Sequence, residues 1–270
     1  MSTTAPRSPD RPTPSPCLLV AAGGVGGLVG ALMGGGTGTI TVPALVRGTK
    51  LTRAVVHGTV TMPNALVAII GSTAYAFRGG AVDLHAGVSM MIGGILGVQA
   101  GARFVTRVSD RTLTRTFIGI LLVVGTQMLL KGASIQLLPT TDMSSLTSGT
   151  TGIVTALILG IIIGAYSAAM GLGGGLLTVP ALVVLFGTIM QTALGTSLAV
   201  MIPNAILSIL AHARQHTLDM RTGLVLAASA LPGAAAGAVI ALALPGGVLN
   251  VVFGAFVLYI AALEIPRAKQ

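Results

Sequence analysis

Long apolar segments separated by short polar ones dominate the chain after residue 16. Two interrupted apolar stretches, 17–46 and 152–187, each precede three uninterrupted segments of 18 to 24 residues. The uninterrupted segments are 54–77, 86–106, 113–130, 192–213, 222–244 and 247–264. Lengths near 20 apolar residues suit helices that cross a bilayer. The pattern therefore predicts an all-α integral membrane protein.

Composition supports this prediction. Hydrophobic residues make up 53% of the chain and charged residues only 8%, whereas soluble domains carry about 25% charged residues. The net charge of +9 arises because the chain has only six acids. Its basic residues stand singly between apolar segments, a pattern that does not indicate nucleic-acid binding. Cys17 is the single cysteine, which excludes an internal disulfide bond.

The polar segments divide the chain. Residues 1–16 are rich in Pro, Ser and Thr and are predicted to form a disordered cytoplasmic tail. A first membrane repeat is expected over 17–130 and a second over 151–270. The polar segment 131–150 is expected to link the repeats outside the membrane.

The two membrane segments carry the same landmarks in the same order. Ile-Thr-Val-Pro-Ala-Leu-Val at 40–46 returns as Leu-Thr-Val-Pro-Ala-Leu-Val at 177–183. At the same offset, Gly58-Thr59 corresponds to Gly195-Thr196. Pro-Asn-Ala also occurs once in each segment. Several ordered landmarks at one offset indicate an internal duplication.

Two topologies are compatible with this duplication. If each interrupted stretch crosses the membrane once, the halves are parallel and Lys and Arg distribute evenly. If each stretch enters the membrane and returns to the same side, each half has three crossings and the halves are inverted. Thirteen Lys and Arg residues then share the N-terminal side, and Arg78 and Lys131 lie opposite. Basic residues collect in short cytoplasmic loops, so the inverted arrangement is favoured, with both termini cytoplasmic.

Each interruption is a glycine run followed by Thr-Val-Pro. The runs are Gly34-Gly35-Gly36-Thr37-Gly38 and Gly171-Leu172-Gly173-Gly174-Gly175. Glycine destabilises a helix, whereas proline is tolerated in a first turn, which Thr41 or Thr178 could cap. The sequence predicts a re-entrant hairpin: a helix, an unwound break and a new helix start near the proline. Two such helix starts that face each other near the midplane of the membrane could bind a small anion.

Three further features carry a family pattern: the paired Gly-rich and Pro-Ala-Leu elements, Gly-Thr-Ser-Leu at 195–198, and Ala-His-Ala-Arg and Leu-Asp-Met within 211–220. In these features the chain resembles the sulfite exporter TauE/SafE family of membrane permeases. The resemblance implies transport of small sulfur-containing anions such as sulfite, sulfonates or sulfoacetate across the bacterial cytoplasmic (inner) membrane. The first half departs from the pattern, with Gly58-Thr59-Val60-Thr61 in place of Gly-Thr-Ser-Leu.

Backbone N–H groups, hydroxyls and amides can bind an oxyanion without a countercharge. The predicted substrate-binding residues are Gly36, Thr37, Gly38, Thr39, Thr59, Asn64, Gly173, Gly174, Gly175, Thr196, Ser197 and Asn204. His57 and His212 are candidates for proton coupling because histidine titrates near neutral pH. Glycines spaced four residues apart elsewhere, as at 23–27, 93–101 and 160–164, are expected only to pack helices.

The function expected is therefore secondary transport of a small sulfur-containing or organic oxyanion. A passive anion channel or uniporter with the same site is the main alternative, because the spans lack buried acids for proton coupling. An enzyme is not indicated: the sequence has no nucleotide-binding loop, and no metal or cofactor is predicted. A structural or assembly subunit remains a further alternative. Expected partners are the anion and the lipid bilayer, with a homodimer left open.

Overall fold

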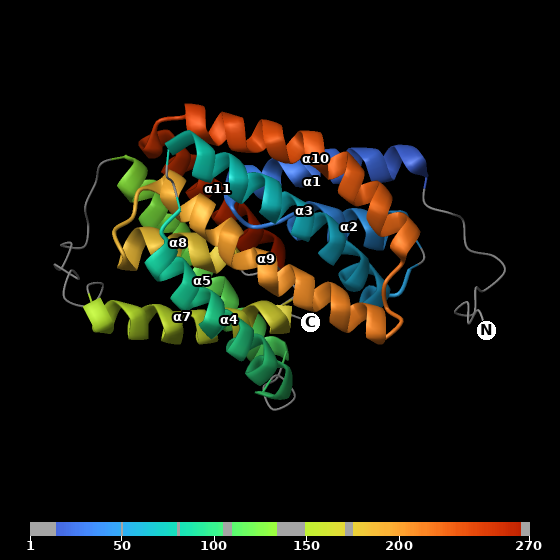
Figure 1. Cartoon of the computed structure of the whole chain (residues 1–270), viewed down its shortest axis with the longest axis horizontal. Coiled ribbons are helices and arrows are strands. Elements are labelled where there is room, and N and C mark those ends of the chain that lie inside the picture. The colour runs from blue at the N-terminus through green and yellow to red at the C-terminus, as the bar shows by residue number, and fades with distance from the viewer. Residues whose placement is uncertain are drawn as a thin grey trace.

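The structure, a computed structural model, describes residues 15–49, 51–79, 82–104, 110–133, 149–170 and 175–265. Within these ranges all regular elements are α-helices, which confirms the predicted class (Figure 1). They are α1 (Pro16–Met33), α2 (Gly38–Gly48), α3 (Arg53–Gly79), α4 (Leu84–Phe104), α5 (Asp110–Gly132), α7 (Gly149–Met170), α8 (Gly175–Leu185), α9 (Met190–Arg214), α10 (Met220–Ala243) and α11 (Gly246–Glu264). The predicted tail up to residue 14, most of the predicted linker, Gly173 and Gly174 lie outside the described residues.

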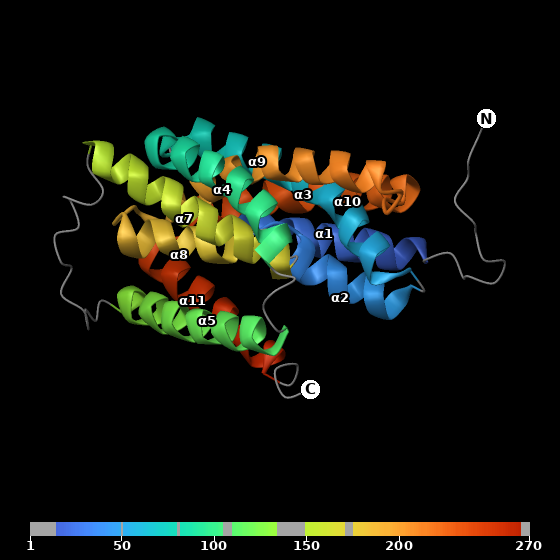
Figure 2. The ribbon, with the colours of Figure 1, turned by 90° about the horizontal axis from the view of Figure 1, so that it is seen from below.

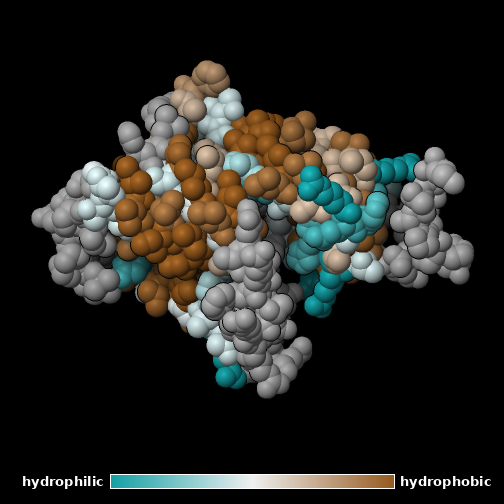
Figure 3. Space-filling view, turned by 60° about the horizontal axis from the view of Figure 1, so that its bottom comes forward, coloured by the Kyte–Doolittle hydropathy of each residue, from teal (hydrophilic) through white to brown (hydrophobic). Residues whose placement is uncertain are grey.

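The six uninterrupted segments correspond to α3, α4, α5, α9, α10 and α11, with ends within a few residues of those predicted. In the described part of the chain, seven helices are long and apolar enough to cross a membrane. Large hydrophobic side chains such as Phe77, Val123 and Tyr259 face outward, and brown hydrophobic surface covers much of Figure 3. A surface of this kind is stable in lipid, and the protein is a multi-pass membrane protein.

The first interruption ends α1 with a left-handed glycine. Gly34 has φ +63° and its N–H bonds to the carbonyl of Gly30, a conformation that favours glycine. Helix α2 then begins at Gly38 after Thr37. The prediction that the new helix starts at Thr-Val-Pro is therefore wrong, because Pro43 lies inside α2. Thr41 instead donates its hydroxyl to the carbonyl of Thr37.

Helix α2 folds back along α1. A Cβ on Gly30 would lie 2.8 Å from the backbone of Gly36, and a Cβ on Gly26 would lie 2.9 Å from the methyl group of Thr41. At the other end, a Cβ on Gly48 would lie 2.5 Å from the side chain of Leu18. This order of contacts makes α1 and α2 an antiparallel hairpin. Figures 1 and 2 place α2 toward one end of the molecule and α8 toward the other.

Helices pair reciprocally between the two halves: α1 packs on α10, and α7 packs on α4. Side chains at the glycines of both interfaces would overlap the backbone of the facing helix. These glycines are Gly23, Gly27, Gly233 and Gly237 in one pair and Gly160, Gly164, Gly93 and Gly97 in the other. Close backbone approach is how helices associate in lipid. The predicted packing role of the described glycines is confirmed.

Helices α3 and α9 lie against each other between these pairs. In each of these helices, half of the apolar segment is buried inside the protein, a larger share than in any other spanning helix described. They therefore form the centre of the bundle, and their side chains reach the first glycine break.

Candidate functional site

The two glycine breaks meet in the interior. Gly175 is the first residue of α8, and a Cβ there would overlap the carbonyl oxygen of Gly34 and the Cα of Gly35. The backbones of the two halves are therefore in direct contact where α1 ends and α8 begins. Only glycine at position 175 permits this approach without displacing the facing chain.

Side chains from α3 and α9 satisfy carbonyl groups that the break leaves without helical partners. The Tyr75 hydroxyl donates to the carbonyl oxygen of Ala31 at 3.2 Å. The Ser197 hydroxyl donates to the carbonyl oxygen of Gly34 at 2.8 Å. A helix end inside a bilayer needs such partners, because water is absent there.

Asn64 of α3 binds the start of α2. Its Oδ1 accepts hydrogen bonds from the backbone N–H of Thr37 at 2.7 Å and from the Thr37 hydroxyl at 2.8 Å. These two donors identify the amide oxygen and therefore orient the side chain. Among the described residues, the Asn64 Nδ2 group has no hydrogen-bond acceptor, so it could donate to a ligand.

A cavity of about 360 Å³ runs beside this contact, between α3, α4, α7, α8 and α9. Its volume falls within the range of small-molecule sites, about 300–1,000 Å³. Its polar lining residues are His57, Thr61, Asn64, Thr178, Ser197, Asn204, Ser208, His212 and Gln215. Among the described lining residues none is Asp, Glu, Lys or Arg. The cavity thus offers neutral hydrogen-bonding groups and two imidazoles.

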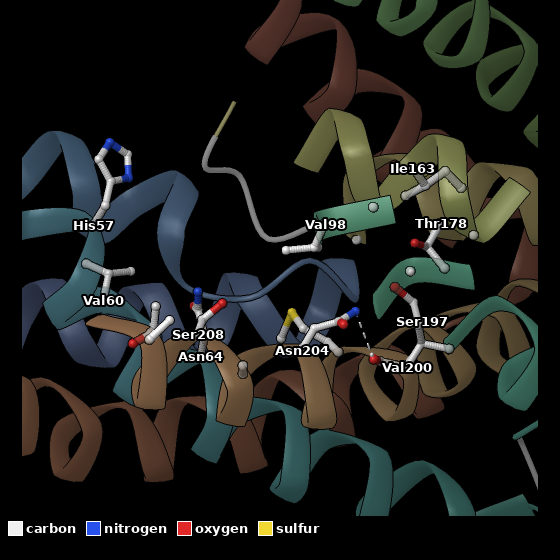
Figure 4. Close-up of a pocket in the computed structure, with 18 of the residues that line it drawn as sticks. His57, Val60, Asn64, Val98, Ile163, Thr178, Ser197, Val200, Asn204 and Ser208 are labelled. Carbon is white, nitrogen blue, oxygen red and sulfur yellow. Dashed lines mark hydrogen bonds between the residues drawn. The ribbon is translucent and has the colours of Figure 1, made fainter. Parts of the chain in front are cut away.

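The cavity has a buried end and an exposed end. Ser197 and Gly175 are buried, whereas Ala211 and Gln215, near the end of α9, are exposed. In Figure 4, His57 lies at one side of the labelled residues and Thr178 and Ser197 lie at the other. Asn64 and Asn204 lie between them. The two amides therefore lie between His57 and the α8 residue Thr178 along the cavity.

The structure separates the predicted binding residues into groups. Asn64, Gly175, Ser197 and Asn204 line the cavity, as do His57 and His212. The residues around the first break that do not line it are Gly36, Thr37, Gly38 and Thr39. Thr59 and Thr196 are fully buried and accept hydrogen bonds from the backbone N–H groups of Asp219 and Asp83.

Sequence reasoning missed several lining residues on α9. Ser208 and Gln215 share a face with Ser197 and Asn204, at spacings of seven, four and seven residues. Such spacings repeat the helical period and could have identified the face. Thr178 also lines the cavity and belongs to the duplicated Thr-Val-Pro motif. Across the described ranges, no group of three or more His, Cys, Asp or Glu could hold a metal ion.

Comparison with known proteins identifies relatives. Residues 2–128 and 156–270 match the sequence model of the family described as "Sulfite exporter TauE/SafE". A "Probable membrane transporter protein YunE" from Bacillus subtilis (strain 168) is 32% identical over 123 residues. That alignment covers 43% of this chain and 45% of the relative's length, so the match spans less than half of each protein. No solved structure matches the chain.

Proposed function

Because the chain belongs to the sulfite exporter TauE/SafE family of membrane transporters, we propose that it moves a small sulfur-containing or organic oxyanion across the bacterial inner membrane. Sulfite, a sulfonate or sulfoacetate are the substrates proposed. The observation that carries the proposal is the cavity. It leads from an exposed mouth to the first residue of α8 and has no acidic residue among its described lining residues.

The chemistry of the lining suits an oxyanion. The amide Nδ2 groups of Asn64 and Asn204 are neutral donors on facing helices. The N-terminus of α8 adds the partial positive charge of a helix dipole at the buried end. Neutral donors bind an anion in a low-dielectric site without a buried countercharge, and the absence of described acids in the lining removes repulsion.

Secondary transport is preferred to a channel because, among the described residues, closely packed groups border the buried end of the cavity near the contact between the two breaks. Beyond Gly175, the Gly34 backbone packs against the side chains of Val179 and Leu194, both fully buried. A cavity that is open at one end suits a site exposed to one side of the membrane at a time. A passive channel would need a continuous path.

The orientation in the membrane forms part of the proposal. Arg53 and Arg214 are exposed at the helix ends nearest the cavity mouth, and Arg47 and Arg221 are exposed in the adjoining segments. The positive-inside rule places this end in the cytoplasm. The antiparallel α1–α2 hairpin would then enter from the cytoplasm and the α7–α8 hairpin from the opposite side. The repeats would be inverted, and the cavity would open inward.

Counterflow in proteoliposomes tests the proposal. Vesicles loaded with unlabelled sulfite, methanesulfonate, sulfoacetate or thiosulfate are diluted into a trace of the same labelled anion. Protein-free liposomes give the background, and acetate tests for lack of selectivity. A transporter gives transient labelled uptake above equilibrium for at least one sulfur anion. A channel gives equilibration without overshoot, and the absence of flux for every anion would exclude both functions.

A further inference from the structure

The imidazole of His212 occupies a fixed position at the cavity mouth. It lies against the backbone of α3, where a Cβ on Gly58 would be only 3.0 Å from the ring atoms Cγ and Nδ1. Its Nδ1 also lies 2.8 Å from the hydroxyl of Thr217, in the loop that follows α9. The ring therefore contacts α3 of the first half and the α9–α10 loop of its own half while it lines the cavity.

Thr217 contacts both the ring and the backbone of His212. Its hydroxyl lies 2.8 Å from Nδ1 and 3.3 Å from the carbonyl oxygen of His212. In the neutral imidazole, the tautomer decides whether Nδ1 or the hydroxyl is the donor. In the imidazolium both ring nitrogens carry a proton, so Nδ1–H donates to the Thr217 oxygen and this hydrogen bond favours the charged form.

The charged and titratable groups around His212 come from three elements. His57 and Arg53 lie on α3, and His57 interacts electrostatically with His212. Arg214 and His216 belong to the end of α9 and its loop. Asp219 begins α10, and its carboxylate accepts hydrogen bonds from the Thr222 N–H and hydroxyl. Two protonated imidazoles would repel each other, so the pair favours a single proton.

We propose that His212 is the proton-binding residue that couples anion movement to proton movement, an inference that rests on the proposed anion transport. A proton on the His212 imidazole would place one positive charge at the mouth of a cavity whose other described lining residues, His57 apart, are uncharged. An entering monovalent anion would neutralise that charge. When the site opens to the opposite side of the membrane, the anion would leave and His212 would release its proton there, so that one proton crosses with each anion. His57 is the less suitable carrier, because no hydrogen bond fixes its ring in the described structure.

The test separates coupling from transport. Proteoliposomes with wild-type protein, His212→Asn or His216→Asn are assayed with labelled methanesulfonate, a sulfonate that stays a monovalent anion over the pH range used. One assay is counterflow at equal pH, and the other is accumulation driven by a pH gradient with the membrane potential clamped. Asn replaces the Nδ1 donor to Thr217 but cannot carry the proton. His216→Asn is the matched control because His216 is exposed and does not line the cavity.

We expect the wild type and His216→Asn to accumulate methanesulfonate on the alkaline side, about tenfold per pH unit for one proton per monovalent anion. His212→Asn should lose this accumulation. Accumulation by His212→Asn, or wild-type counterflow without any gradient-driven accumulation, would overturn the inference and leave transport intact. Absence of wild-type counterflow for every sulfur anion would instead remove the proposed function.

A second variant covers the case in which His212→Asn loses counterflow as well. Thr217→Val keeps the imidazole but removes the acceptor of Nδ1–H. Because the imidazolium then loses a hydrogen bond, the pH dependence of accumulation should move toward lower pH. An unchanged pH profile in Thr217→Val would contradict the role of His212.

Discussion

The hydroxyl of Thr196 in α9 accepts a hydrogen bond from the backbone N–H of Asp83, at 2.8 Å, where the chain enters α4. The equivalent Thr59 in α3 accepts one from the N–H of Asp219, at 3.1 Å, where the chain enters α10. Each Asp in turn accepts from the backbone N–H of the residue three positions later. The Gly-Thr motif of each half thus anchors the start of a helix in the other half.

These reciprocal bonds make the two threonines structural in the present conformation. Thr196→Val keeps the shape of the side chain but leaves the Asp83 N–H without its acceptor. We expect a loss of about 1–3 kcal/mol in the free energy of unfolding, measured as lower thermal stability in detergent. Thr196→Ser should restore most of it. Thr126→Val is the matched control, because Thr126 is exposed on α5 and bonds only within its own helix; equal losses in both variants would contradict the assignment.

The contrast between Thr196 and Ser197 shows that hydropathy alone did not predict the direction in which each side chain points. Successive residues of a helix differ by about 100° in direction. Thr196 therefore faces α4 while its neighbour Ser197 faces the break and the cavity. Hydropathy placed both in a span but does not give the direction of either side chain; the helical spacing of Ser197, Asn204 and Ser208 is the signal that marks the cavity face. In the first half, Val60 lines the cavity at the position equivalent to Ser197.

Other features followed directly from the sequence. The spans, the glycine breaks and the four-residue glycine spacings were predictable because length and glycine content are local properties. The start of α2 was not, because it depends on Asn64, which lies 27 residues further along the chain and binds Thr37. The distant Asn64 side chain thus stabilises a helix start at Gly38, before the position that Pro43 indicates.

The contact between the breaks gives a second prediction. Gly175→Ala adds a methyl group that would overlap the Gly34 carbonyl and the Gly35 Cα, so one backbone must move. We expect the variant to insert in the membrane but to lose at least most of its anion counterflow, with a stability loss of about 1–3 kcal/mol. Gly119→Ala on α5 is the control, since nothing lies within 4 Å of a Cβ there. Normal counterflow in Gly175→Ala would show that this contact is dispensable.

Charge in the cavity gives a third prediction. Asn204 lines the cavity, and its Nδ2 makes only a long hydrogen bond, 3.4 Å, to Val200 in its own helix. Asn204→Asp is nearly isosteric but places a carboxylate where an anion is proposed to bind. We expect little change in thermal stability and a loss of at least about tenfold in kcat/KM for anion uptake, equivalent to about 1.4 kcal/mol.

The control for this prediction is Asn204→Ser, which keeps the site neutral and polar. It should retain more transport than Asn204→Asp even though it is the larger change in shape. If the two variants lose transport equally, side-chain shape rather than charge determines the effect, and the proposed anion path past Asn204 is wrong.

The final prediction concerns orientation. Thr52 is exposed in the segment between α2 and α3. The antiparallel α1–α2 hairpin puts the end of α2 beside the start of α1, so Thr52 should share a membrane side with the N-terminus. In a Cys17→Ser background, we expect Thr52→Cys to react with an impermeant maleimide only after the cells are permeabilised. Ile189→Cys, exposed before α9, should react in intact cells. A single crossing of the interrupted stretch would instead put Thr52 outside, so labelling of Thr52→Cys in intact cells would reject the inverted arrangement.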